Sequence, residues 1–142
     1  MIQSEGNIKE CIKYMEEGNI KKGIKYLKQS SEGLYRLGIF YIDGDYVSQN
    51  IEKGVEYLFQ SLSNMENSDS LYELGRLYIE ENEKFLKMKK NIPISLGNRH
   101  DFDSSNRKNT SPKYAIQEGI KYYERSAFLG NLNAMYALGI LE

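Results

Sequence analysis

The phrase LYELGRLY at Leu71–Tyr78 decides the fold, because close relatives of it occur twice more in the chain. These are LYRLGIFY at Leu34–Tyr41 and MYALGIL at Met135–Leu141, each with a Leu-Gly pair in the same place. Self-similarity at a fixed spacing is the sequence signature of a structural unit that is stacked several times. The sequence therefore predicts a repeat architecture.

A second phrase alternates with the first. It reads IKKGIKYL at Ile20–Leu27, IEKGVEYL at Ile51–Leu58 and IQEGIKYY at Ile116–Tyr123, and a fainter copy, IKECIKYM, begins at Ile8. One copy of each phrase together makes a period of about 37 residues, which is typical of solenoids built from helical hairpins.

Both phrases have the spacing of amphipathic helices. In the second phrase Ile51, Val55 and Leu58 recur at i, i+4 and i+7, which places them on one apolar stripe. Sustained two-residue alternation and β-hairpin turns, which would favour strands, are absent from the sequence. We therefore expect an all-α chain of about seven helices, at residues 7–17, 19–31, 32–43, 50–63, 69–84, 114–129 and 132–142.

Glycines recur in the middle of these predicted helices. They are Gly38, Gly75 and Gly139 in the first phrase, and Gly54 and Gly119 in the second. A glycine inside a helix costs about 1 kcal/mol relative to alanine, so a compensating contact is expected. We predict that the two helices of a unit approach closely where these glycines meet.

The combined spacing resembles the Sel1-like repeat, a relative of the tetratricopeptide repeat. The residues that carry the resemblance are Leu37, Gly38, Tyr41, Gly44, Val47, Lys53 and Tyr57, then Gly119, Tyr122, Ser126, Ala127, Gly130, Ala134, Leu138 and Gly139, with Gly75 and Tyr78 between them. The resemblance covers roughly residues 19–83 and 114–142. It implies an α–α superhelix, a right-handed solenoid of helical hairpins, in a single domain at 1–142.

The repeat units implied in this way are unequal. They cover about 7–31, which is degenerate, 32–63, 68–129, which an insert at 84–113 interrupts, and 132–142, which is partial. The family's alanine after lysine is glycine at Gly54. The chain also ends inside a unit, and solenoid ends usually carry capping helices. The exposed C-terminal end is therefore expected to be available for pairing with another chain.

The resemblance implies non-enzymatic scaffolding of a protein or peptide partner, identity unknown, on the concave face. Three tyrosines lie three residues before the Leu-Gly glycines and border that face: Tyr35, Tyr72 and Tyr136. Arg36, Glu73 and Arg76 lie beside them. Tyr and Arg dominate binding hot spots. The alternative interpretation is that these tyrosines serve packing between helices.

The insert at 84–113 supports a second functional hypothesis. It holds eight Lys/Arg and two Asp, whereas the rest of the chain is acidic, and the overall net charge is −1. Its basic side chains would contact an anionic membrane surface, nucleic acid or an acidic partner. Its Asn, Ser and Asp content instead favours a disordered spacer.

Other candidate sites are weak. His100 is the only histidine and Cys11 the only cysteine. His100 with Asp101 and Asp103 lacks the ligands in fixed geometry that zinc requires, and Cys11 lies among apolar residues, so neither a metal, nor a cofactor, nor catalysis is expected. Without a signal peptide or a membrane-spanning run, the cytoplasm is the default expectation. The secretory pathway follows if the chain is part of a longer Sel1-type protein.

Overall fold

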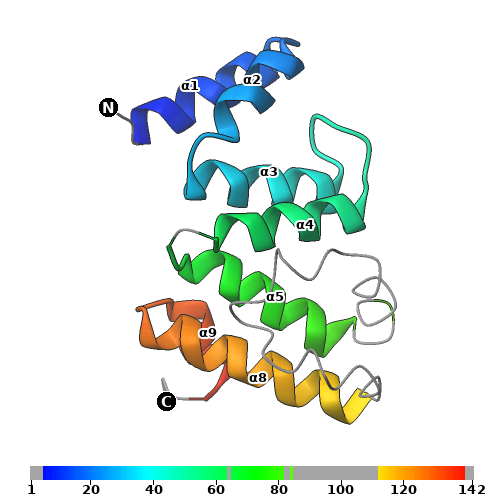
Figure 1. Ribbon diagram of the computed structural model, residues 1–142, viewed down its shortest axis with the longest axis vertical. Coiled ribbons are helices and arrows are strands. Elements are labelled where there is room, and N and C mark those ends of the chain that lie inside the picture. Colours follow the sequence, from blue (N-terminus) through cyan, green and yellow to red (C-terminus); the bar gives the residue numbers. More distant parts are fainter. Residues whose placement is uncertain (1–4, 64, 82–83, 85–111, 140–142) are drawn as a thin grey trace. The chain divides into compact units, whose positions relative to one another are not determined.

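A computed structural model describes residues 5–63, 65–81, 84 and 112–139, and this part of the chain is helical without strands (Figure 1). The described residues form α1 (Glu5–Glu16), α2 (Ile20–Leu27), α3 (Ser31–Asp43), α4 (Ile51–Ser61), α5 (Ser68–Glu80), α8 (Pro112–Phe128) and α9 (Leu132–Ala137). The predicted fold class, an all-α repeat of helical hairpins with about seven helices, is confirmed. The handedness of the superhelix stays a prediction.

Several helices are shorter than the sequence predicts. The predicted helix 69–84 ends at Glu80, because Glu81 leaves the helical conformation at φ −125° and ψ 41°. The predicted helix 19–31 ends at Leu27. Ser30 then adopts an extended conformation and caps the next helix, since its side chain accepts a hydrogen bond from the Gly33 amide at 2.9 Å.

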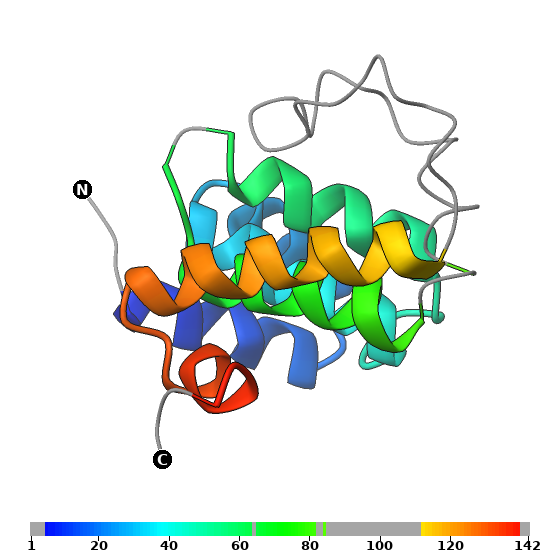
Figure 2. The same cartoon turned by 90° about the horizontal axis from the view of Figure 1, so that it is seen from below.

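The chain divides into two compact units, Met1–Met65 and Glu66–Glu142. The first unit holds the hairpins α1–α2 and α3–α4, and the second holds the hairpin α5–α8 with α9 packed on α8. Figure 2 shows α8 running alongside α5. The prediction of one domain over 1–142 stays a prediction.

Within the hairpins, the helices approach each other closely at paired glycines. A Cβ atom added to Gly54 would lie 2.6 Å from the carbonyl oxygen of Gly38, and one added to Gly119 would lie 2.9 Å from that of Gly75. Each distance is far shorter than an ordinary contact between such atoms. These four positions therefore lack side chains because the backbone of the facing helix occupies the space.

The prediction that Gly139 lies inside a helix is wrong. The helix α9 ends at Ala137, and Gly139 follows it with φ +76°. A Cβ atom added there would meet nothing within 4 Å. The helix that packs against α9 is the preceding helix α8, and no further helix follows α9 among the described residues, so this glycine ends a helix and faces no partner glycine.

The helix α1 has a different role from the one its sequence indicates. The phrase at Ile8 resembles a second helix, yet α1 takes the place of the first helix and pairs with α2. A Cβ atom added to Gly23 would lie 3.0 Å from the carbonyl oxygen of Cys11. Cys11 thus stands where Gly38 and Gly75 stand in the other hairpins. The predicted unit at 7–31 is a hairpin, but its Leu-Gly pair is missing.

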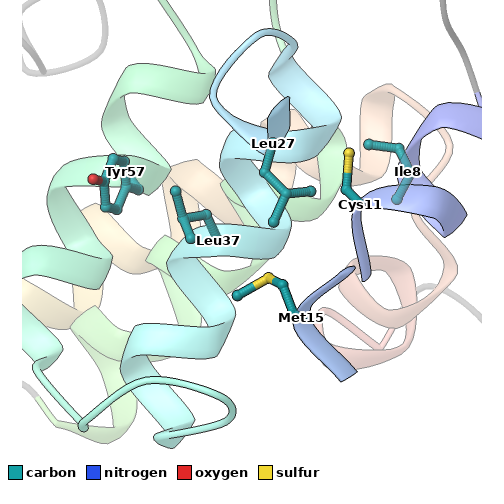
Figure 3. Packing of buried hydrophobic residues seen from close by; sticks show 6 residues of the cluster. All are labelled: Ile8, Cys11, Met15, Leu27, Leu37 and Tyr57. Carbon is teal, nitrogen blue, oxygen red and sulfur yellow. The ribbon is translucent and has the colours of Figure 1, made fainter. Parts of the chain in front are cut away.

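The apolar stripes of the first unit meet in one core cluster (Figure 3). Its buried members are Ile8, Cys11, Met15, Leu27, Leu37 and Tyr57. Cys11 is only 4% exposed, and burial together with the nearby Glu10 raises the pKa of its thiol. A thiol that is held protonated is a poor nucleophile, so Cys11 acts as a small core residue.

A stacked pair of tyrosines recurs in all three hairpins, with one ring from each helix. The pairs are Tyr14 with Tyr26 at a centroid distance of 6.0 Å, Tyr41 with Tyr57 at 5.7 Å, and Tyr78 with Tyr122 at 5.4 Å. Tyr41 and Tyr78 are the motif tyrosines that follow the Leu-Gly pairs. In each helix the paired tyrosine lies three residues after the central glycine, or after Cys11 in α1, so the recurrence of an aromatic residue there reflects packing between the two helices.

Candidate functional site

The predicted tyrosine row lies on three helices that belong to two units. Tyr35 is on α3 in the first unit, whereas Tyr72 on α5 and Tyr136 on α9 are in the second. Tyr35 and Tyr72 are partly buried, and Tyr136 is 75% exposed. The same motif position therefore has different surroundings in each copy, and only the second unit holds two of the three predicted tyrosines.

Tyr72 takes part in packing inside the second unit. Its ring stacks on that of Tyr123 from α8, with centroids 5.4 Å apart and an angle of 19° between the planes. The pair lies against a small core cluster that also contains Ala127 and Ala134. Tyr72 is thus held rigidly, with part of its side chain still accessible to solvent.

Arg76 is fixed one turn after Tyr72 by two carboxylates on its own helix. Its Nη2 lies 2.9 Å from an oxygen of Glu73, and its Nη1 lies 3.3 Å from an oxygen of Glu80. Burial lowers the pKa of Arg76, but Glu73 and Glu80 together raise it above its usual value. The guanidinium group is therefore charged at every relevant pH and is held in one orientation, with 28% of its side chain exposed.

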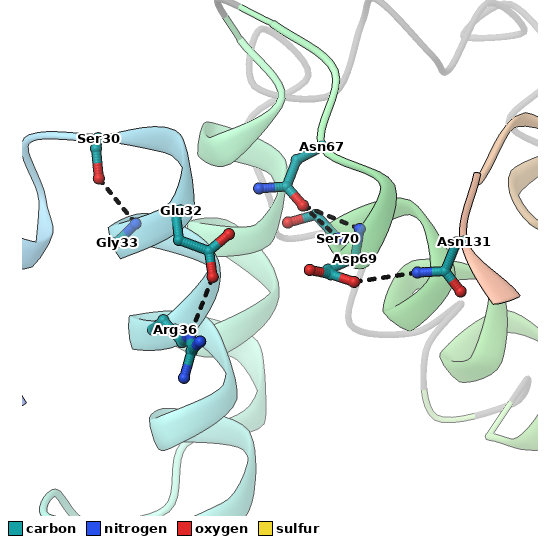
Figure 4. A network of polar contacts seen from close by, with 8 residues as sticks. All are labelled: Ser30, Glu32, Gly33, Arg36, Asn67, Asp69, Ser70 and Asn131. Atoms are coloured by element: carbon teal, nitrogen blue, oxygen red, sulfur yellow. Dashed lines mark hydrogen bonds and ion pairs between the residues drawn. The ribbon is translucent and has the colours of Figure 1, made fainter. Parts of the chain in front are cut away.

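The corresponding pair on α3 is looser. Arg36 contacts Glu32 at 2.9 Å, but 46% and 41% of the two side chains are exposed, so solvent screens the pair (Figure 4). Arg36 has one carboxylate partner in the described residues, whereas Arg76 has two. Of the two predicted arginines, Arg76 therefore has more carboxylate partners and is less exposed.

A polar contact that no local sequence pattern predicts links the first turn of α5 to the N-cap residue of α9. The side chain of Asn131 accepts a hydrogen bond from the Ala134 amide at 2.9 Å and donates one to Asp69 at 3.0 Å (Figure 4). Asn67 caps α5 by accepting from the amides of Asp69 and Ser70. These bonds fix the helices that carry Tyr72 and Tyr136. The only sequence signal is an asparagine directly before each helix.

The tyrosine contact in the second unit predicts a pH dependence of stability. Burial raises the pKa of Tyr123 to about 12, and Tyr72 and Glu80 add to the effect. Because the unfolded chain deprotonates near its usual value of 10, folding stability should be fully present below about pH 10. It should fall by about 2 kcal/mol as the pH rises toward 12, from roughly 1.4 kcal/mol per pKa unit.

Urea unfolding of the wild type and of Tyr123→Phe at several pH values between 9 and 12 measures this difference. The variant should lose less stability than the wild type over that range, because phenylalanine has no proton to lose. Parallel losses in both proteins would contradict the assignment to Tyr123.

The described residues include a fixed charge but no group that could hold a metal ion. No group of three His, Cys, Asp or Glu side chains among them is placed to hold a metal ion. His100, Asp101 and Asp103 lie outside the described residues, as does nearly all of the basic insert at 84–113. What the described surface does provide is a fixed cation, Arg76, and tyrosine rings in the same unit.

No described helix combines the length and the apolar character needed to cross a membrane. The compartment, whether cytoplasm or secretory pathway, stays a prediction.

Comparison with known proteins agrees with the hairpin architecture. The family model described as Sel1 repeat matches residues 4–33, 31–63 and 112–131, which together exceed half of the chain. The first two matches correspond to the hairpins α1–α2 and α3–α4, and the third covers α8. No curated protein and no solved structure gives a significant match.

Proposed function

Since this chain belongs to the Sel1 repeat family, we propose that it is a non-enzymatic scaffold that binds a protein or peptide partner. The binding surface is formed by the first helix of each repeat unit, namely α3, α5 and α9. Sel1 repeats generally mediate protein–protein interaction. The proposed binding surface is the concave face of the repeats. Its proposed contact residues are Tyr35, Arg36, Tyr72, Glu73, Arg76 and Tyr136.

The observation that carries the proposal is the state of Tyr136. It is 75% exposed, although the equivalent Tyr72 is packed on Tyr123. A tyrosine offers a large apolar area and a hydroxyl group at a low cost in conformational entropy, and such side chains are common anchors in interfaces. Tyr136 is thus the residue of the row that is most available to a partner.

Arg76 supports the same surface through its rigidity. An arginine already held by Glu73 and Glu80 loses little further side-chain entropy when it binds. Its planar group then presents its remaining donors to carboxylate or carbonyl oxygens of a partner. Tyr35 and Arg36 hold the same motif positions on α3, so we propose them as the equivalent contact residues of the first unit.

We expect Tyr136→Ala to reduce the recovery of a specific partner from native lysate by at least about tenfold, as loss of a hot-spot aromatic does. Arg76→Ala should reduce it as well. Tyr46→Ala is the matched control, since Tyr46 is also an exposed tyrosine, at 41%, but lies outside the proposed surface. Circular dichroism checks that all variants keep their helical content. Equal recovery with wild type, Tyr136→Ala and Arg76→Ala would contradict the proposal.

The basic insert is tested in the same experiment with a chain that lacks residues 86–112. Loss of the partner only with this chain would place the function in the insert, which would then contact an acidic protein, nucleic acid or an anionic membrane. Phosphate contacts with nucleic acid would also weaken steeply with added salt.

A further inference from the structure

The helix α2 presents a row of lysines that the proposed function does not use. Residues 20–28, which are α2 and its last cap residue, contain four lysines and no acidic residue: Lys21, Lys22, Lys25 and Lys28. Lys21, Lys25 and Lys28 are spaced at i, i+4 and i+7, so they share one stripe of the helix, and all three are exposed. Gly23 and Leu27 are buried on the other side.

This row is unfavourable for the helix that carries it. Lys21 and Lys22 stand in the first turn, where the positive end of the helix dipole disfavours cations. Asn19 precedes the helix but makes no side-chain capping bond. Lys21 and Lys25 are also like charges four residues apart, which is an arrangement that destabilises a helix.

The helices α4 and α5 do not share these features. Asn50 caps α4 by accepting from the Lys53 amide, and Glu52 follows it in the first turn. Asn67 caps α5 in the same way, and Asp69 follows. Positions that break local rules without a compensating gain in the folded chain are candidates for binding, because the gain then comes from a partner.

The lysines are also available for a partner. None of the four takes part in an ion pair with another described residue. The ammonium group of Lys22 lies over the Tyr14 ring, 4.5 Å from its centroid, and that of Lys28 lies 5.8 Å from the centroid of Tyr57. Such contacts orient a lysine without neutralising its charge.

We propose that the stripe of Lys21, Lys25 and Lys28, with Lys22 beside it, docks an acidic segment of a partner protein. The three lysines span about 10 Å along the helix axis, from a rise of 1.5 Å per residue. Carboxylates repeated at the same spacing on a partner would face them in register. The net charge of the chain is −1, and a protein that binds nucleic acid usually shows a strong basic excess, so the charge favours a short acidic peptide.

The test measures binding of a fluorescein-labelled decaglutamate peptide to the full chain by fluorescence anisotropy at low ionic strength. Lys21→Gln/Lys25→Gln/Lys28→Gln should weaken binding by about tenfold or more, as the loss of three charge contacts predicts. The matched control removes three exposed lysines of the described residues outside the stripe, in Lys9→Gln/Lys13→Gln/Lys113→Gln. This control should change the affinity by less than about twofold.

Three results would overturn the proposal. The first is a wild-type chain that does not bind the peptide at about millimolar concentration. The second is an equal loss in both variants, or a loss confined to a third variant in the insert, Lys87→Gln/Lys89→Gln/Lys90→Gln. The third is that the wild-type chain binds a ten-residue thymidine oligonucleotide or phosphatidylserine vesicles more tightly than it binds the peptide, and that the stripe variant abolishes this binding. The stripe would then serve nucleic acid or lipid. The stripe variant should keep its helices, because glutamine has a similar helix propensity to lysine. Circular dichroism verifies this.

Discussion

Replacing Leu37 with alanine is expected to lower the free energy of unfolding by about 3 kcal/mol, within the range of 2–5 kcal/mol for buried leucines. Leu37 is fully buried on α3, in the cluster that contains Leu27, Met15 and Tyr57 (Figure 3). The substitution removes apolar surface from contact and leaves a cavity that neighbouring helices cannot fill completely. For a domain with a total stability of about 5–15 kcal/mol, this loss is large.

The chain contains its own control for this prediction. Leu138 holds the same place in the third copy of the phrase, but it directly follows α9 and is only half-buried against the cluster of Tyr123, Ala127 and Ala134. Leu138→Ala should therefore cost about 1 kcal/mol or less, because less apolar area returns to water. Urea unfolding followed by circular dichroism compares the two. Equal losses would mean that the motif position, rather than burial, sets the energetic role of this leucine.

The contrast between these two leucines illustrates which features of the fold could be predicted from the sequence. Helix type depends on local spacing, such as Ile51, Val55 and Leu58 on one stripe, and this spacing is present in every copy of the second phrase. The surroundings of a motif residue depend on whether another helix packs on it. The sequence contains the Leu-Gly pair at Leu138 and Gly139, but it does not contain a partner helix for that copy among the described residues.

The same distinction applies to the candidate site. The fixation of Arg76 follows from local spacing, because Glu73 and Glu80 are three and four residues away on one helix. The hydrogen bond between Asn131 and Asp69 joins residues that are 62 positions apart, so no local pattern reports it. Likewise, the sequence does not reveal that α1 is the first helix of its hairpin, because Cys11 stands where the first helices of the other hairpins have a glycine. The two repeated phrases predict where helices form, but they do not predict which residues distant in sequence contact each other.

The close approach of α3 and α4 leads to the second large prediction. We expect Gly54→Ala to lower the free energy of unfolding by about 2 kcal/mol, within the usual range for overpacking of a tight contact. The new methyl group would lie 2.6 Å from the carbonyl oxygen of Gly38 and 2.6 Å from Cγ1 of Ile42. The first of these neighbours is backbone, so it cannot move away by changing a rotamer. The two helices must separate instead, and the contacts around them weaken.

Two opposing effects set the sign of this result. Alanine favours the helix by about 1 kcal/mol over glycine, and repeats of this type carry an alanine at this position. Lys9→Ala, at an exposed helical position, reports how an alanine substitution behaves without a clash. Urea unfolding of both variants should show a loss for Gly54→Ala and little change for Lys9→Ala. A gain in stability for Gly54→Ala would mean that α3 and α4 can move apart at little cost, and that the glycine pair is not what holds their spacing.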